Sequence, residues 1–406
     1  MHIYRLENVV QPYAWGSRTA IADLLGKPVP SQEPQAELWM GTHPKGPSMA
    51  VAGDQKIPLQ QLIDRQPVGI LGRDVSMRYG NALPYLFKVL AAAHPLSIQA
   101  HPSKQQAAEG FSRENREGKA VDAPDRNYRD DNHKPEIICA LTPFWGLNGF
   151  RLAAAAVDLL TPVCPTALDD AFQDLKSLQG KGVRNFFEAM MTLTAEKRKA
   201  AAREVLDKAG PLADTSPIYR WMVNLTRAYP ADMGALSPAL LNLICLEPGQ
   251  AMFLPAGQLH AYLDGLGIEL MANSDNVLRG GLTPKHVDVP ELLSVVRFEE
   301  TSITILEPGS MGPAESGYDS PVEEFSLTVI RPSKGQPYHS PSIRNVEMLL
   351  CTAGEGRIES GGQSECLTVK KGDSFLVPAG LQAYAIDGNL TIYKAAVPLV
   401  RPSSKT

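Results

Sequence analysis

The sequence predicts a mainly β protein with two copies of one small β-unit and a helical segment inserted in the first. Three observations lead to this expectation. The 406 residues include 33 glycines and 33 prolines, which favours many short strands joined by tight turns. One short pattern occurs twice, at 249–257 and again at 372–380. Between residues 152 and 238 the hydrophobic period changes to that of helices.

The composition is that of a globular protein. Hydrophobic residues make up 44% of the chain and charged residues 20%, which is too apolar for a disordered chain. The formal net charge is −5 and no basic stripe stands out, so nucleic acid is not an expected partner. No apolar run approaches the ~18 residues of a membrane-spanning helix, and the N-terminal residues lack the layout of a signal peptide. The five cysteines are scattered, which favours a reducing compartment. We therefore expect a cytoplasmic monomer without a membrane partner.

Changes in composition and hydrophobic pattern along the chain divide it into three expected domains. Residues 1–151 mix short apolar runs with glycine and proline, and together with 239–312 they are expected to form the first β domain. Within them, the polar stretch 103–133 predicts a long loop. Residues 152–238 are the expected helical insertion. Residues 313–406 are the expected C-terminal β domain, with short strands over 320–398.

Local signals place the helices of the insertion. Apolar residues recur at helical spacing over 168–175. Thr194 is a suitable cap for a helix that ends at Gly210. Ser216 begins another helix, which ends before Pro230. The apolar faces of these helices are typical of packing, and they predict no chemistry.

The repeated pattern contains a candidate metal ligand in its first copy. Gly249, Pro255, Gly257 and His260 fit G-x5-P-x-G-x2-H, the second motif of cupins, which are small jelly-roll barrels. In such a unit the chain turns at Pro-x-Gly and returns with the histidine as its first inward side chain. A lone histidine after a turn is more often structural, so other ligands are needed. The second copy has Ala383 at this place, which predicts one metal per chain and no metal ligands in the C-terminal cupin.

Two further segments supply polar side chains with suitable spacing. Ser97, Gln99 and His101 alternate along an expected strand and therefore share one face, which lines either a cavity or an exposed surface. Glu136 opens a strongly apolar strand, so its carboxylate lies at a solvated end or binds something positive. Lys134 precedes it on the same face.

The candidate ligands are two imidazoles, one carboxylate and one amide oxygen. This donor set suits a divalent ion of borderline softness, and zinc fits best, with water or substrate completing the coordination. No cysteine is needed.

Five separated segments resemble type I phosphomannose isomerases and occur in that family's order. They are residues 13–17, 37–44, 96–102, 132–136 and 273–285. The resemblance extends from the N-terminus to about residue 297. It implies a catalytic cupin interrupted by a helical insertion and followed by a C-terminal jelly roll.

The same resemblance implies a function. The family's enzymes use zinc to interconvert mannose 6-phosphate and fructose 6-phosphate, a step that supplies GDP-mannose synthesis or brings mannose into glycolysis. The implied zinc ligands, for one Zn²⁺ per chain, are Gln99, His101, Glu136 and His260. The implied active-site arginine is Arg279.

This chemistry moves a proton between C1 and C2 of an open-chain sugar phosphate through an enediolate. The site therefore needs a base and positive charge near the oxygens. Arg279 suits the enediolate, with a surface ion pair to Asp275 as the alternative. Lys134 and Glu269 lead as candidates for the base, ahead of Asp275 and His133. Glu269 is polar within an apolar strand and so either faces a cavity or is paired.

The substrate's phosphate needs cations or hydroxyl groups. Ser97, Lys88 and Lys285 are the candidates, and His133 is a further candidate substrate contact. Lys88 interrupts an apolar strand, which is costly unless the ammonium is paired or reaches the barrel rim.

Three other functions remain open from the sequence. The first is a cupin isomerase that acts on glucose 6-phosphate. The second is a regulatory sugar-binding cupin, although the helical segment has no basic recognition face. The third is a bifunctional isomerase–nucleotidyltransferase, which would need a glycine-rich nucleotide-binding domain that the sequence does not show.

Overall fold

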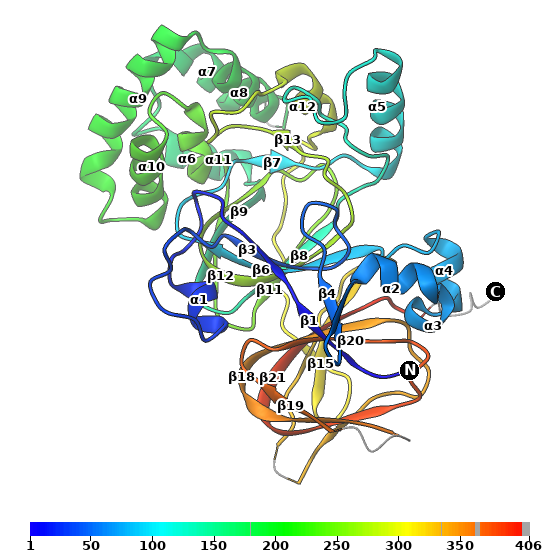
Figure 1. Cartoon of the computed structure of the whole chain (residues 1–406). Coiled ribbons are helices and arrows are strands. Elements are labelled where there is room, and N and C mark those ends of the chain that lie inside the picture. The colour runs from blue at the N-terminus through cyan, green and yellow to red at the C-terminus, as the bar shows by residue number, and fades with distance from the viewer. Residues whose placement is uncertain (179, 334, 362–365, 400–406) are drawn as a thin grey trace, which may run out of the picture.

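The fold consists of two large antiparallel β-sheets with a group of helices at one end (Figure 1). A computed structural model describes every residue of the chain except 179, 334, 362–365 and 400–406. The prediction of a mainly β fold with inserted helices is confirmed. Among the described residues, no helix has both the length and the apolar character needed to cross a membrane.

The first sheet forms the barrel that carries the candidate site. Its main path runs β10-β9-β12-β6-β3-β2, and four short strands pair beside it. The strands are β2 (Val9–Gln11), β3 (Glu37–Met40), β6 (Tyr85–Ala92), β7 (Gln99–Ala100), β8 (Glu136–Ala140), β9 (Phe144–Phe150), β10 (Leu241–Leu246), β11 (Ala251–Leu254), β12 (His260–Ala272) and β13 (Leu278–Arg279).

The second sheet combines both ends of the chain. Its path is β14-β15-β16-β21-β18-β20-β1-β4-β5, with β17 and β19 beside it. Its strands are β1 (Tyr4–Glu7), β4 (Met49–Ala52), β5 (Gln55–Pro58), β14 (Gly309–Ser310), β15 (Glu315–Gly317), β16 (Ser326–Ile330), β17 (Tyr338–His339), β18 (Glu347–Ser360), β19 (Cys366–Lys370), β20 (Ser374–Val377) and β21 (Tyr384–Ala396). The short strands expected over 320–398 include two long ones, β18 and β21.

The division of the chain between the two sheets differs from the expected domain boundaries at the N-terminus. Strand β1 pairs with β20 of the C-terminal repeat and with β4. Residues 4–7 and 49–58 were expected in the first β domain, yet they extend the C-terminal sheet. Strand pairing between distant segments leaves no local signal, which is why the pattern of residues 1–151 did not reveal it.

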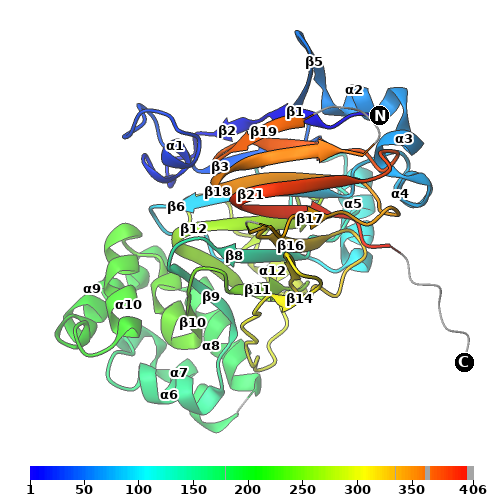
Figure 2. The same ribbon diagram turned by 90° about the horizontal axis from the view of Figure 1, so that it is seen from below.

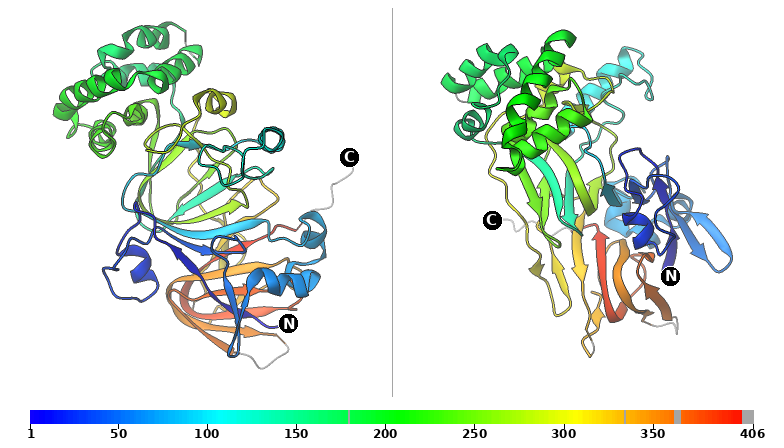
Figure 3. Two further views of the ribbon diagram at one scale, coloured as in Figure 1. Left: turned by 45° about the horizontal axis from the view of Figure 1, so that its top comes forward. Right: turned by 90° about the vertical axis from the view of Figure 1, so that its left-hand side faces the viewer.

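Helices lie mainly at the end opposite the C-terminal strands (Figure 3). Between β9 and β10 they are α6 (Ala153–Leu160), η1 (Thr166–Leu168), α7 (Asp169–Ser177), α8 (Gly180–Thr192), α9 (Ala195–Ala209), η2 (Gly210–Leu212), α10 (Pro217–Ala228), η3 (Met233–Leu236) and α11 (Ser237–Leu240). The others are α1 (Ala20–Leu24), α2 (Leu59–Arg65), α3 (Pro67–Leu71), α4 (Arg73–Arg78), α5 (Lys104–Arg116) and α12 (Val289–Val295). Thr194 and Ser216 cap α9 and α10 with their side chains, as predicted.

The loop expected over 103–133 is wrong at its start, where helix α5 forms. Ser103 accepts a hydrogen bond from the backbone of Gln106, and the Gln106 side chain accepts one from the backbone of Ser103. This reciprocal capping box supplies two hydrogen bonds that the first turn lacks. Because α5 is mostly polar, hydrophobic periodicity gave no sign of it.

Packing on both sides of the barrel strands decides which side chains face the site. Phe87 and Val89 of β6 and Ile268 and Leu270 of β12 belong to a core shared with the C-terminal sheet (Figure 2). Side chains alternate along a strand, so the residues between them point into the barrel. Lys88 is therefore placed on the inner face. At β7, Ile98 and Ala100 join the core of the helical insertion, which leaves Gln99 and His101 for the barrel side.

Candidate metal and active site

Three buried side chains from different strands converge inside the first barrel. His101 follows β7, Glu136 opens β8 and His260 opens β12. The Nε2 atom of His101 lies 3.4 Å from Oε1 of Glu136, and Nε2 of His260 lies 3.4 Å from its Oε2. Ligand atoms of the three residues all lie within 4.8 Å of one another. The structure thus brings together three of the four predicted metal ligands.

Both imidazoles are held with one nitrogen free for a metal. Nδ1 of His101 donates to the backbone oxygen of Asn276 at 2.7 Å, and Nδ1 of His260 donates to that of Gln258 at 2.9 Å. These bonds place the ring proton on Nδ1, so each Nε2 carries its lone pair toward Glu136. Burial, assisted by the charge of Lys134, lowers the pKa of His101 to about 4 and keeps the ring neutral.

Glu136 completes a donor set that the protein satisfies only in part. Among the described residues, the two histidine Nε2 atoms and Oε2 of Glu136 have no hydrogen-bond partner, while Oε1 of Glu136 lies 2.8 Å from the ammonium of Lys134. Burial by itself raises the pKa of Glu136, but the charge of Lys134 outweighs it and holds that pKa well below its usual range. Buried polar atoms without partners are rare because they are costly. Two imidazoles and one carboxylate aimed at one point fit a divalent cation.

Gln99, the fourth predicted ligand, lies beside this group. In the strand register Gln99 is directly opposite His260 on one side and opposite Arg279 on the other. Directly opposite residues of antiparallel strands share a face. The amide of Gln99 therefore faces the same side as the imidazole of His260, and its role as a ligand stays a prediction.

Lys88 and Glu269 form a buried ion pair next to the candidate metal centre. The Lys88 ammonium lies 2.9 Å from Oε2 of Glu269 and 3.6 Å from Oε2 of Glu37. Burial opposes the charge of Lys88, but the three carboxylates of Glu269, Glu37 and Glu136 outweigh it and raise the pKa of the lysine. Burial raises the pKa of Glu269, against the opposing charge of Lys88. Of the two interpretations of Lys88, the structure shows the paired one.

Tyr262 is a site residue that the sequence analysis missed. Its hydroxyl is buried and has no hydrogen-bond partner among the residues that the structure describes. Burial raises the pKa of Tyr262 well above its usual value, and the charges of Glu136 and Glu269 raise it further. A register shift in β12 between Tyr262 and Asp264 inserts one extra residue. This bulge places Glu269 on the same face as His260 and Tyr262 despite the change from even to odd positions.

Asp275 and His133, the less favoured candidates for the base, are both paired. Asp275 contacts Nε2 of His43 at 3.2 Å and the ammonium of Lys45 at 2.9 Å, and not Arg279. Burial raises the pKa of Asp275, but these two neighbours outweigh it and hold that pKa below its ordinary value. Nε2 of His133 lies 2.7 Å from a carboxylate oxygen of Glu324, near the start of the C-terminal sheet.

Three cations, Arg279, Arg129 and Lys285, lie close enough to influence one another, and no carboxylate among the described residues pairs with them. Burial and the charge of Arg129 lower the pKa of Arg279. Burial and the charges of both arginines lower the pKa of Lys285. Within the described part of the chain, none of the three side chains forms an ion pair, which makes this group a place for an anion. Arg129 was missed because it lies in the polar stretch read as a loop.

Comparisons with known proteins agree with this site. Residues 3–153 match the catalytic domain of type I phosphomannose isomerase, and residues 321–397 match the cupin domain of mannose-6-phosphate isomerase. Mannose-6-phosphate isomerase of Escherichia coli (strain K12) is 40% identical over 389 residues, which cover 95% of this chain and 97% of that protein.

Solved structures show the same similarity. An alanine mutant of phosphomannose isomerase from Salmonella typhimurium has 36% identity and a TM-score of 0.90, covering 98% of this chain and 100% of that chain. A zinc-bound mannose 6-phosphate isomerase has 37% identity and a TM-score of 0.89 over the same shares of the two chains.

Proposed function

The chain belongs to the type I phosphomannose isomerase family, and we propose that it interconverts mannose 6-phosphate and fructose 6-phosphate. The observation that carries this proposal is the convergence of His101, Glu136 and His260 on one point, with both histidine Nε2 atoms unpartnered among the described residues, beside the carboxylate of Glu269, whose pKa is raised. In this role the enzyme would supply mannose 6-phosphate for GDP-mannose or bring mannose into glycolysis.

Zinc is the metal that we assign to the site, one ion per chain. His101, Glu136 and His260 would hold it, with Gln99 as the fourth ligand. When bound, zinc supplies a Lewis acid for the sugar's carbonyl and hydroxyl oxygens. Neutral imidazoles and a charged carboxylate are the protonation states that such binding requires.

We assign the proton transfer between C1 and C2 to Glu269. A carboxylate with a raised pKa is a stronger base than an ordinary one. Because its pKa is closer to neutral pH, it can both take up and release the proton during one turnover. Lys88, directly opposite Glu269 and 2.9 Å away, orients the carboxylate. Lys134, whose ammonium lies 2.8 Å from Glu136, then serves as a proton donor to the substrate oxygens. Asp275, tied to His43 and Lys45, is assigned a positioning role.

The positive charge of Arg279 and its neighbours completes the site. The guanidinium of Arg279 is permanently charged and is suited to stabilise the enediolate oxygens. Lys285 and Arg129, which belong to the same group of cations, are assigned to the phosphate. Ser97, half-buried before β7, is a further phosphate contact in this proposal.

A coupled assay tests the function. We expect the protein to form fructose 6-phosphate from mannose 6-phosphate, to lose this activity after chelation and to regain it with added zinc. Glucose 6-phosphate, offered in parallel, tests the alternative cupin isomerase. Turnover of glucose 6-phosphate alone, or full activity after complete removal of metal, would contradict the proposal.

Replacing the proposed base removes turnover without removing the metal. We expect Glu269→Gln to lower kcat by about 10²- to 10⁴-fold, because an amide accepts no proton. Metal content, measured by elemental analysis, should stay at the wild-type level, since Glu269 is not one of the metal-ligating group.

Glu37→Gln is the matched control for this variant. Glu37 is the second carboxylate near the Lys88 ammonium, so the substitution disturbs the same ion pair network without removing the proposed base. A Glu269→Gln enzyme that keeps more than about a tenth of wild-type kcat would exclude Glu269 as the base.

Removing a phosphate-binding cation affects substrate binding more than turnover. We expect Lys285→Met and Arg129→Met each to raise KM for mannose 6-phosphate about tenfold, because each loses one charge-assisted contact. Inorganic phosphate should also inhibit these variants less than it inhibits the wild type. If KM for mannose 6-phosphate is unchanged in both variants, the phosphate is held elsewhere.

A further inference from the structure

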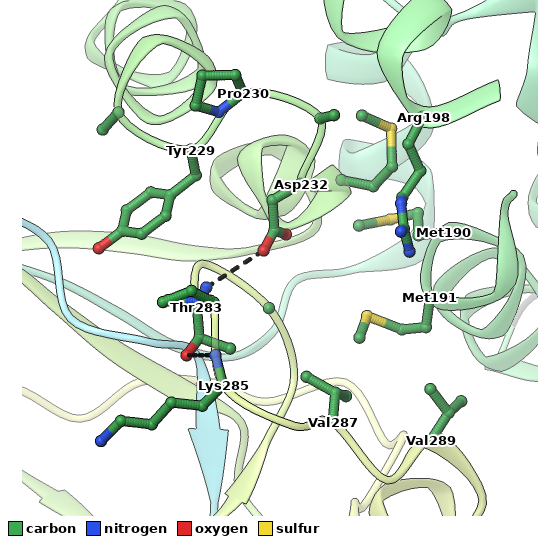
Figure 4. A pocket seen from close by; sticks show the side chains of 15 residues that line it. Met190, Met191, Arg198, Tyr229, Pro230, Asp232, Thr283, Lys285, Val287 and Val289 are labelled. Carbon is green, nitrogen blue, oxygen red and sulfur yellow. Dashed lines mark hydrogen bonds between the residues drawn. The ribbon is translucent and has the colours of Figure 1, made fainter. Parts of the chain in front are cut away.

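A cavity of about 620 Å³ lies behind the chain segment that carries Lys285 (Figure 4). Met190 and Met191 of α8 and, after Lys285 in the chain, Val287 and Val289 are among the residues that line it. The Lys285 side chain extends away from the two methionines. The segment around Lys285 is therefore not supported by close packing from behind, which raises the question of what holds it in place.

The strand ladder holds Arg279 but ends soon after it. Arg279 pairs with Gln99 in the β13–β7 register. Gly280 donates its backbone N–H to the oxygen of Ile98 at 2.7 Å, and Ile98 donates to the oxygen of Gly281 at 3.0 Å. Beyond Gly281 no further β7 pairing is present in the described structure. The backbone of Arg279 is thus held by its pairing with β7.

Asp232 of the helical insertion binds the backbone just beyond the end of the β13–β7 pairing. Its Oδ2 accepts the backbone N–H of Thr283 at 3.2 Å, and its Oδ1 accepts that of Gly234 at 2.8 Å. The hydroxyl of Thr283 in turn accepts the backbone N–H of Lys285 at 3.1 Å. Figure 4 draws the two bonds that link the Asp232 carboxylate to the backbone of Lys285.

The backbone on both sides of the contact between Asp232 and Thr283 has little room and adopts uncommon conformations. A Cβ atom on Gly281, whose φ is +123°, would lie 3.0 Å from Oδ1 of Asp232. The next residue, Leu282, has a φ of 52°, and Ala231, before Asp232, has a φ of 69°. Left-handed conformations are uncommon for residues other than glycine and persist where the surroundings impose them. Two of them lie one on each side of the contact between Asp232 and Thr283, so the chain is tightly constrained there.

We propose that Asp232 is a positioning residue for the substrate's phosphate, acting through Thr283 on Lys285. This inference rests on the proposed function, because it takes Lys285 as a phosphate contact. The carboxylate of Asp232 holds the backbone at Thr283. It thereby keeps the Lys285 ammonium close to Arg279 and Arg129. Arg279, held by β7, is outside its influence. The helical insertion thus contributes to substrate binding through one side chain without touching the substrate.

The test separates KM from kcat in the zinc-loaded enzyme. We expect Asp232→Ser to raise KM for mannose 6-phosphate about tenfold and to leave kcat within about twofold of wild type. Serine still caps the turn by accepting from Gly234, but its single, shorter hydroxyl does not also reach Thr283. Asp232→Asn, which keeps one acceptor oxygen at full length, should show an intermediate KM.

A double-mutant cycle shows whether the effect passes through Lys285. In the Lys285→Met background, we expect Asp232→Ser to change KM by less than about twofold, since the group it positions is gone. Ser216→Ala is the matched control, because Ser216 caps α10 of the same insertion without contacting Thr283. That variant should keep wild-type KM.

Hydrogen exchange gives a reading that does not depend on activity. The amides of the 282–286 segment should exchange faster in Asp232→Ser than in the wild type or in Ser216→Ala. Equal exchange, an equal fall in kcat and in kcat/KM, or a full additional KM increase in the Lys285→Met background would each overturn the proposal. A wild-type enzyme inactive on mannose 6-phosphate would instead refute the proposed function, while the exchange experiment would still decide whether Asp232 holds the segment.

Discussion

His260→Ala is expected to lose the bound zinc and the isomerase activity together. The imidazole of His260 is one of three ligand groups, and its Nε2 has no other partner among the described residues. Removing one of so few ligands weakens metal binding by orders of magnitude, because the remaining donors leave the coordination incomplete. Elemental analysis after gel filtration should find well under one zinc per chain.

Thermal unfolding measures the loss of zinc binding without an activity assay. A ligand that binds only the folded state stabilises it, by about 2.7 kcal/mol at a hundred times its Kd. Adding zinc to the metal-free wild type should therefore raise Tm, and the increase should disappear in His260→Ala. A variant that retains zinc at full occupancy would exclude His260 as a ligand.

His94→Ala is the control for this substitution. His94 is an exposed histidine at the end of β6, outside the group that brings its ligand atoms together. It should keep both zinc and activity. If His94→Ala also lost the metal, the effect of His260→Ala would reflect a general disturbance of the barrel.

Arg279→Ala is expected to keep the fold and the zinc but to lower kcat by about 10²- to 10³-fold. The size follows from the usual cost of removing one group that stabilises a developing oxyanion. The backbone of Arg279 is held by its pairing with Gln99, which does not depend on the side chain. The guanidinium makes no ion pair within the described residues, so its removal leaves no buried carboxylate without a partner.

Two variants make this prediction specific. Arg279→Lys keeps a positive charge but loses the planar group with several donors, so we expect an intermediate kcat. Arg220→Ala, an exposed arginine of α10, should leave kcat unchanged. Turnover near the wild-type rate in Arg279→Ala would exclude a role of Arg279 in stabilising the enediolate, and a loss of zinc would assign Arg279 to the metal centre instead.

The C-terminal sheet contributes to the site through packing and through one ion pair. Its inner face shares a core with β6, β8 and β12, the strands that carry Lys88, Glu136 and Glu269. Glu324 reaches His133, three residues before Glu136. This second repeat unit therefore supports the outer face of the barrel whose inner face carries the proposed active site.

Sequence by itself determined the features whose cause is local. The repeated turn predicted that His260 begins a strand, and alternation along the chain predicted that Gln99 and His101 share a face. Thr194 and Ser216 identified the starts of two helices. Each of these depends on residues within a few positions of one another, where spacing and capping chemistry act directly. The resemblance of five short segments to one family added the ligand set and Arg279.

Tertiary structure alone decided how distant segments meet. The pairing of β1 with β20, the bulge that turns Glu269 to the side of His260, and the approach of Arg129 to Arg279 all depend on contacts between remote parts of the chain. So does the bond from Asp232 to the backbone of Thr283. Such contacts follow from the packing of whole sheets and helices, and the local spacing of residues carries no record of them.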